Sequence, residues 1–327
     1  MAAERDLSQI YRLLKLSCPV CNNPNTFYRL KANVCWPLGR EEDGHPLEWG
    51  WQIKGFENLD PLRFFFSLCH KCYFAAETEN ARFRGCTNGA ERFRADYSQA
   101  GLQWLLLRSV DGRGVAQVLG KNMAEGDLLC RTVVTFHLGI FSECLRRELS
   151  PGTLARFYLR LAWVYRQRER YYADTDLAEL RRRLKGAAAS WAADLPKKRG
   201  YPVEPALALS EGSALRQALA FFERNFTLMT EGGLEDELRF KRLVAGIGFR
   251  LYRLSGKEEV YQQALRLYSD LMESCLEIIH DRSIVGGVVG RAREFLGISG
   301  DNSRKLRQMH KRREAHLQRK NNSRRSQ

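Results

Sequence analysis

Apolar residues recur at helical spacing in four stretches of the second half of the chain. They fall within 154–165, 215–229, 240–251 and 264–275, and each set lies on one face of a helix. Ser150 and Pro151 precede the first stretch and are typical of a helix start. Because breaks such as Gly232–Gly233 and Ser255–Gly256 are short, we expect antiparallel helical hairpins between residues 96 and 300.

Two of these helices share a further pattern. Ala162 is followed three residues later by Tyr165, and Gly246 is followed in the same way by Phe249. A small residue and then an aromatic one, within an amphipathic helix, resembles the first helix of a tetratricopeptide repeat. The 34-residue period of that repeat is not kept. The pattern therefore predicts tetratricopeptide-like hairpins, with a generic helical bundle as the alternative.

Residues 1–95 have a different composition and carry the most specific motifs. This segment contains turn-forming Pro, Gly and Asn, and it includes Cys18-Pro19-Val20-Cys21 and Cys69-His70-Lys71-Cys72. Two thiolates in each tight turn can together give one tetrahedral Zn²⁺ four sulfur ligands. Four protein ligands leave no open position for water, so such a site is structural. We predict a mainly α protein with a small, zinc-ribbon-like β module at residues 1–95.

Several alternatives to this ligand set stay open. Cys35, Cys86 or His70 could replace one of the four cysteines. The gap between the pairs, residues 22–68, is also longer than the roughly 15–20 residues of a compact ribbon. A Cys-x-x-Cys pair can also act as a redox dithiol, which makes a thiol redox protein a further hypothesis.

The net charge of +15 is concentrated at the C-terminal end. Residues 301–327 contain ten Lys or Arg and two acids, which gives 10 − 2 = +8. Few apolar residues accompany these charges, so composition predicts a disordered tail that could bind RNA or DNA phosphates. The residues assigned to that contact are Arg304, Lys305, Arg307, Lys311, Arg312, Arg313, Arg319 and Lys320.

At the cysteine motifs the sequence resembles a bacterial family known as domain of unknown function 2225. The resemblance rests on Cys18–Cys21, Leu59–Phe65, Cys69–Glu77 and Leu159–Arg166. His70, Tyr73 and Asp60 stand where the family pattern has Pro, Gly and Asn, which puts the shape of the second turn in question. The resemblance implies a metal-binding N-terminal module ahead of tetratricopeptide-like helices, and it implies no reaction.

Nucleotide, zinc-protease and serine-hydrolase motifs are absent from the sequence, so we predict a binding protein and no enzyme. The first hypothesis is a zinc-stabilised scaffold whose helical domain binds a protein or peptide, with Arg156, Arg160 and Arg181–Arg183 as a basic face. The alternative is a nucleic-acid-associated protein. No small-molecule substrate and no membrane contact are predicted. Nine cysteines, an odd number, and no secretion signal favour the cytoplasm.

Overall fold

The computed structural model describes residues 7–78, 93, 96–97, 102–103, 114–195, 203–226, 233–284 and 286–325. The chain forms two compact units. Unit 1 contains Met1–Leu38 and Glu48–Phe221, and unit 2 contains Gly39–Leu47 and Phe222–Gln327. Among the described helices, none combines the length and the apolar character that crossing a membrane requires.

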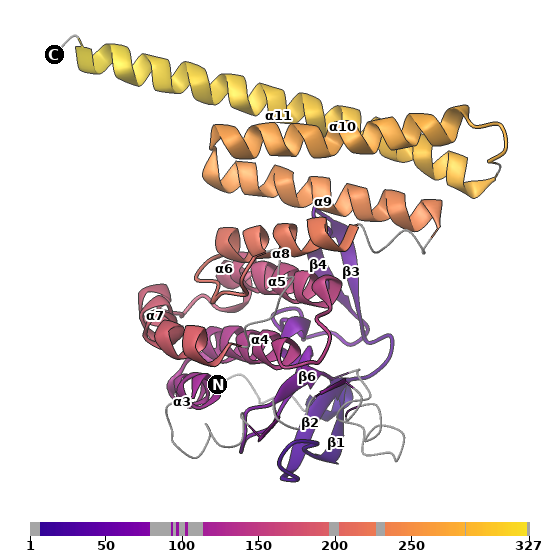
Figure 1. Cartoon of the computed structure of the whole chain (residues 1–327). Coiled ribbons are helices and arrows are strands. Elements are labelled where there is room, and N and C mark those ends of the chain that lie inside the picture. The colour runs from indigo at the N-terminus through magenta and orange to yellow at the C-terminus, as the bar shows by residue number, and fades with distance from the viewer. Residues whose placement is uncertain are drawn as a thin grey trace. The chain divides into compact units, whose positions relative to one another are not determined.

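The N-terminal region is built from three two-stranded sheets (Figure 1). The first and third pairs are antiparallel, and each is closed by a loop that carries one Cys-x-x-Cys pair. Two short 3-10 helices accompany them, η1 (Leu7–Gln9) and η2 (Pro61–Phe64). The strands are β1 (Tyr11–Ser17), β2 (Pro24–Leu30), β3 (Cys35–Arg40), β4 (Pro46–Trp51), β5 (Phe66–Leu68) and β6 (Ala75–Glu77).

The helices of unit 1 pack around α4, whose residues are almost all buried. Asp127 caps the start of α4, and Ser150 caps α5 by accepting a hydrogen bond from the Thr153 amide, as the sequence predicts. The Ala75 amide of β6 donates to Ser142 Oγ on α4, which ties the third hairpin to this core. The helices are α3 (Val115–Glu125), α4 (Leu128–Cys144), α5 (Pro151–Arg166), α6 (Arg168–Tyr171), α7 (Leu177–Asp194) and α8 (Glu211–Phe226), the last of which continues into unit 2.

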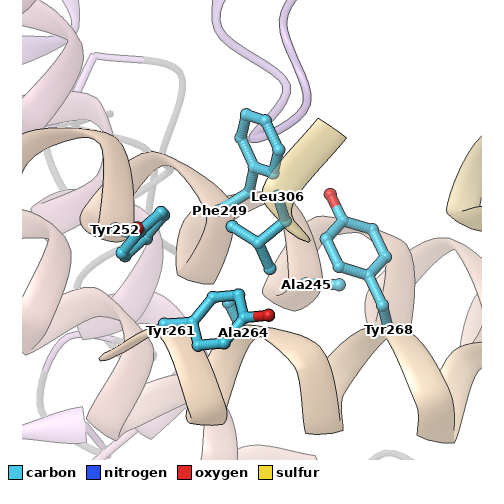
Figure 2. Close-up of a cluster of buried hydrophobic side chains, with 7 residues drawn as sticks. All are labelled: Ala245, Phe249, Tyr252, Tyr261, Ala264, Tyr268 and Leu306. Atoms are coloured by element: carbon cyan, nitrogen blue, oxygen red, sulfur yellow. The ribbon is translucent and has the colours of Figure 1, made fainter. Parts of the chain in front are cut away.

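Unit 2 is dominated by three long helices that lie side by side, α9 (Leu234–Ser255), α10 (Glu258–His280) and α11 (Gly287–Arg325) (Figure 1). Their buried faces meet in two apolar clusters. Figure 2 shows the first, in which Phe249 and Tyr252 of α9 face Tyr261 and Tyr268 of α10, with Leu306 of α11 between them. Gly256 ends α9 in the left-handed conformation, which glycine adopts without steric cost.

The β3–β4 turn, residues 39–47, contacts α9 within unit 2. A Cβ atom placed on Gly246 would lie 2.0 Å from the carbonyl oxygen of Glu42. Only glycine therefore lets the turn backbone approach the helix this closely. The sequence pattern interprets Gly246 as the small residue of a repeat, whereas the structure gives it this contact.

Replacing Gly246 with alanine is expected to destabilise the protein by about 1–3 kcal/mol, because the new methyl group overlaps backbone atoms that cannot move independently. Gly297→Ala is the matched control, since a Cβ on that α11 residue meets no atom within 4 Å. Helix propensity alone predicts a gain of about 0.5–1 kcal/mol there. Urea unfolding of both variants measures the difference, and equal stabilities would contradict the contact.

The basic segment 301–325 is helical in the structure, in place of the disordered tail that its composition predicts. α11 runs through residue 301 without a break, and Asn302, Ser303 and Leu306 are buried against the other helices of unit 2. Positions 302, 306, 309 and 310 recur at helical spacing, and their effect is lost when composition is averaged over the segment. Residues 311–323 are all exposed.

The predicted fold class is confirmed in its main features. The chain is mainly helical, with a small β-strand region and a cysteine cluster near the N-terminus. The tetratricopeptide-like arrangement of the helices stays a prediction.

Candidate metal centre

The first Cys-x-x-Cys pair lies in the loop that closes the β1–β2 hairpin. Ser17 pairs with Pro24, so residues 18–23 form the loop. The Cys18 amide donates to the Asn23 carbonyl and the Asn22 amide donates to the Cys18 carbonyl, both at 2.9 Å. The Val20 amide points at Cys18 Sγ, 3.4 Å away. Asn22 has φ 58°, a left-handed conformation that asparagine tolerates better than most residues.

The second pair repeats this construction in the β5–β6 loop. Leu68 pairs with Ala75, which leaves residues 69–74 as the loop. The Cys69 amide donates to the Phe74 carbonyl and the Tyr73 amide to the Cys69 carbonyl, again at 2.9 Å, and the Lys71 amide lies 3.4 Å from Cys69 Sγ. Tyr73 has φ 60°, so the second turn has the same shape as the first although neither Gly nor Asn occupies this position.

A contact with α3 accounts for the tyrosine in a position that favours glycine. A Cβ on Gly120 would lie 2.3 Å from the Tyr73 ring, so the ring packs directly on the α3 backbone. A bulky residue in the left-handed region carries a conformational cost of about 1–3 kcal/mol. The ring contact offsets part of that cost and fixes the second loop to the helical part of unit 1.

The two loops bring all four predicted cysteines together. The distance is 3.6 Å between Cys18 Sγ and Cys72 Sγ and 3.5 Å between Cys21 Sγ and Cys69 Sγ. The separations within the group run from 3.5 to 3.8 Å. Ligands at about 2.3 Å from a tetrahedral centre lie about 3.8 Å apart, so the sulfurs are spaced as a four-cysteine metal site requires.

Burial and mutual contact set the proton affinity of these thiols. Cys18, Cys69 and Cys72 are at most 1% exposed, and Cys21 is half-buried. Hydrogen bonds from the Cys18 and Cys72 thiols lower the pKa of Cys69. The same contacts, together with burial, raise the pKa of Cys72. Several thiolates can coexist at these distances only beside a cation, and a soft divalent ion suits four sulfur ligands.

Asn25 connects the two loops, although nothing in the sequence marks it out. Its Nδ2 lies 3.6 Å from Cys69 Sγ, and its Oδ1 accepts a hydrogen bond from the His70 amide at 3.1 Å. The side chain comes from β2 and is 6% exposed. Asn25 therefore orients a sulfur of the second loop from the strand that follows the first.

Asn25→Ala is expected to weaken zinc binding about 10- to 100-fold, the range typical for loss of a group that orients a metal ligand. Competition with a chromophoric chelator measures this change. Asn23→Ala is the control, because the Asn23 side chain donates only to the neighbouring Pro24 carbonyl, on the exposed side of the loop. Equal affinities of the two variants would contradict the role of Asn25.

The alternative ligands lie elsewhere. His70 is exposed and contributes its backbone amide to Asn25. Cys35 is not part of the cysteine group, and Cys86 lies outside the described residues. Cys130, Cys144 and Cys275 are buried in helices, as small core residues. The described part of the chain thus assigns the cluster to the four predicted cysteines.

Most of the arginines predicted to form a basic face are bound within the protein. Arg182 and Arg183 pair with Glu179, and Arg181 donates to the Leu209 carbonyl. Arg156 pairs with Glu77 at 2.8 Å. These contacts leave Arg160, discussed below, as the member of the set without an ion pair or hydrogen bond among the described residues.

An extended segment, residues 203–210, lies against the helices of unit 1. Its backbone is held by side chains of α4, α5 and α7 (Figure 1). Ala206 exchanges hydrogen bonds with the Tyr158 hydroxyl, and the Ala208 amide donates to His137 Nε2 at 2.9 Å. Trp191 Nε1 donates to the Pro205 carbonyl. This face of the helical region is therefore covered by the chain itself.

The basic residues predicted to bind nucleic acid lie along α11 and differ in their surroundings. Arg313 donates to the Ser255 carbonyl at the end of α9, where a cation stabilises the helix terminus. Arg304 pairs with Asp301. Lys311, Arg312, Arg319 and Lys320 are exposed. Lys305 and Arg307 are exposed as well.

The strand region, the helical region and the four-cysteine cluster define a class of mainly helical protein with an N-terminal metal-binding module. The chain belongs to the family described as "Uncharacterized protein conserved in bacteria (DUF2225)", whose sequence pattern matches residues 13–275. The match includes all four clustered cysteines and ends before α11. No curated protein and no solved structure matches the chain.

Proposed function

We propose that this chain is a zinc-stabilised binding protein without catalytic activity. One Zn²⁺ held by Cys18, Cys21, Cys69 and Cys72 would join the β1–β2 and β5–β6 hairpins, and the helical part would present a surface to a protein or peptide. The observation that carries the proposal is the tetrahedral spacing of four sulfurs on two loops of the same shape. Four protein ligands suit a structural ion.

The character of the loops supports a structural site over a redox dithiol. A reactive Cys-x-x-Cys pair needs an accessible thiolate, whereas three of these sulfurs are at most 1% exposed. No disulfide occurs among the described cysteines, and we assign the protein to a reducing compartment, the cytoplasm.

Cobalt substitution tests the coordination directly. Co²⁺ in place of zinc is expected to give the intense sulfur-to-metal absorption and visible bands of a tetrahedral four-thiolate site, unchanged by added azide or cyanide. Bands that shift with such ligands would indicate an open coordination position and contradict a purely structural site. Four native thiols that react freely in the metal-loaded chain would favour the redox alternative.

A second candidate function is association with nucleic acid. It is supported by the exposed second half of α11, where Lys311, Arg312, Arg319 and Lys320 leave the helix bundle without buried contacts. Neutralising these four residues should reduce the salt dependence of binding to single-stranded RNA or DNA, since each phosphate contact releases counterions. Binding that is absent at low salt, or unchanged in the variant, counts against this candidate.

A further inference from the structure

A pocket of about 480 Å³ lies in unit 1, apart from the four clustered cysteines. Its volume falls in the range of about 300–1,000 Å³ that is typical of small-molecule sites. Residues from η2, β4, β6 and α5 form its wall. Those that carry the argument are Trp49, Phe64, Phe65, Glu77, Arg156 and Arg160.

Two hydrogen-bond donors on this wall are buried and have no partner among the described residues. They are Nη1 of Arg160 and Nε1 of Trp49. A buried donor without an acceptor costs free energy, and a guanidinium costs more because it is charged. Burial, followed by the nearby charge of Arg156, lowers the pKa of Arg160 to about 10, so the group is still a cation at neutral pH.

The acidic groups nearby are committed to other partners. Glu77 accepts from Arg156 Nη2 at 2.8 Å, and Arg156 keeps 44% of its side chain exposed, so this ion pair lies toward solvent. Asp60 accepts from the Tyr172 hydroxyl and the Leu62 amide. Two guanidinium groups and one carboxylate on the wall therefore leave a single net positive charge, which belongs to Arg160.

The rest of the wall is apolar and rigid. Phe65 stacks on Phe136, with ring centroids 5.6 Å apart, and meets the edge of Phe66. The Arg160 guanidinium lies over the Phe65 ring, 4.5 Å from its centroid. Cys35 adds no charge, because burial and then the Asp60 carboxylate raise the pKa of its thiol to about 12. A ligand here would meet one cation, an indole N–H and aromatic faces.

We infer that this pocket binds an organic carboxylate attached to an apolar group, with Arg160 as its cationic partner. A guanidinium pairs its planar N–H groups with both carboxylate oxygens, and the phenylalanine rings cover the apolar part of the ligand. A single net charge favours a monoanion. A phosphate dianion would also meet the carboxylate of Glu77.

The carboxylate could belong to a free carboxylic acid or to the C-terminus of a peptide, and calorimetric titration of the zinc-loaded full chain distinguishes these sources. The probes are 3-phenylpropionate and its neutral amide, and the peptide acetyl-Ala-Ala-Phe with a free or an amidated C-terminus. Both carboxylates should bind saturably, and each amide about tenfold or more weakly, the effect of losing a charge-assisted hydrogen bond. Tighter binding of the peptide acid identifies a chain terminus as the source, and tighter binding of 3-phenylpropionate identifies a free acid.

Variants of the protein complete the test. Arg160→Met should weaken 3-phenylpropionate binding about tenfold or more, and Arg160→Lys by less, since it keeps the charge but loses the planar fork. Arg182→Gln, an exposed residue of α7 ion-paired with Glu179, is the control and should bind as the wild type does. Arg160→Met should not lower the thermal midpoint of the ligand-free protein, because it removes an unpaired buried charge.

Four results would overturn the inference. They are no saturable binding of either carboxylate, equal affinity for acid and amide, unchanged affinity in Arg160→Met, and displacement of 3-phenylpropionate by inorganic phosphate at equal concentration. Should Arg160→Met fail to fold, the comparison of acid with amide and the Arg160→Lys variant decide the question. The pocket contains none of the four clustered cysteines, so zinc binding can hold or fail independently of these outcomes.

Discussion

Replacing Cys72 with serine is expected to abolish stoichiometric zinc binding and to cost at least about 3 kcal/mol of stability. The β5–β6 strands pair over only three residues each, so their short ladder contributes little stability by itself. A shared ion would supply the cross-link between the two hairpins. Elemental analysis of the purified chain and denaturant unfolding measure the two effects.

Cys35→Ser is the matched control for this prediction. Cys35 belongs to the same N-terminal region and its side chain is partly buried, but it lies outside the sulfur group. It should keep one zinc ion per chain and nearly wild-type stability. If both variants lose or keep metal to the same extent, the assignment of ligands is wrong.

Acidification between pH 6.5 and 4 is expected to destabilise unit 1 through His137. Nδ1 of this histidine donates to the Val133 carbonyl at 2.8 Å, and Nε2 accepts from the Ala208 amide at 2.9 Å, so the ring must be neutral. Burial lowers the pKa of His137 from 6.5 to about 4. A proton on Nε2 would face the Ala208 N–H, two donors against one another.

The sign and size of this effect follow from proton linkage. Because the folded pKa lies below the unfolded pKa, the unfolded chain takes up the proton first as the pH falls. Stability is therefore complete above pH 6.5 and is lost as the pH falls toward 4, by about 3 kcal/mol in total. The loss should release the 203–210 segment that His137 helps to hold.

A comparison with His137→Gln isolates this contribution. The variant cannot titrate at this position, so its stability should vary less with pH, although it is lower at neutral pH. Other groups cancel in the difference, including Asp60, whose pKa burial raises to about 6 and whose effect has the opposite sign. Parallel pH profiles of the two proteins, measured by urea unfolding, would contradict the neutral buried ring.

The metal cluster could be predicted from the sequence because each half of it is local. Two Cys-x-x-Cys turns suffice to fix four ligands, and the residues that follow each pair need only a left-handed backbone. Tyr73 shows the limit of this reasoning. Its side chain alone suggests a differently shaped turn, and only the contact with Gly120 of α3 explains why the turn keeps its shape.

The features that the sequence missed depend on distant contacts. Asn25 is an ordinary strand residue until its amide meets the second loop. The tail looks disordered by composition because its few buried positions, such as Leu306, are diluted among charges. Arg160 belongs to an amphipathic helix in which arginines are common, and only its buried, unpartnered Nη1 separates it from Arg156.

The central claim is that one divalent ion joins two loops separated by residues 22–68. Its most direct test is the metal content of the wild-type chain purified under reducing conditions, combined with unfolding in the presence of a strong chelator. We predict one zinc ion per chain and loss of the N-terminal hairpin structure when the ion is removed. A chain that arrives without metal, unfolds cooperatively and is insensitive to the chelator would contradict the claim.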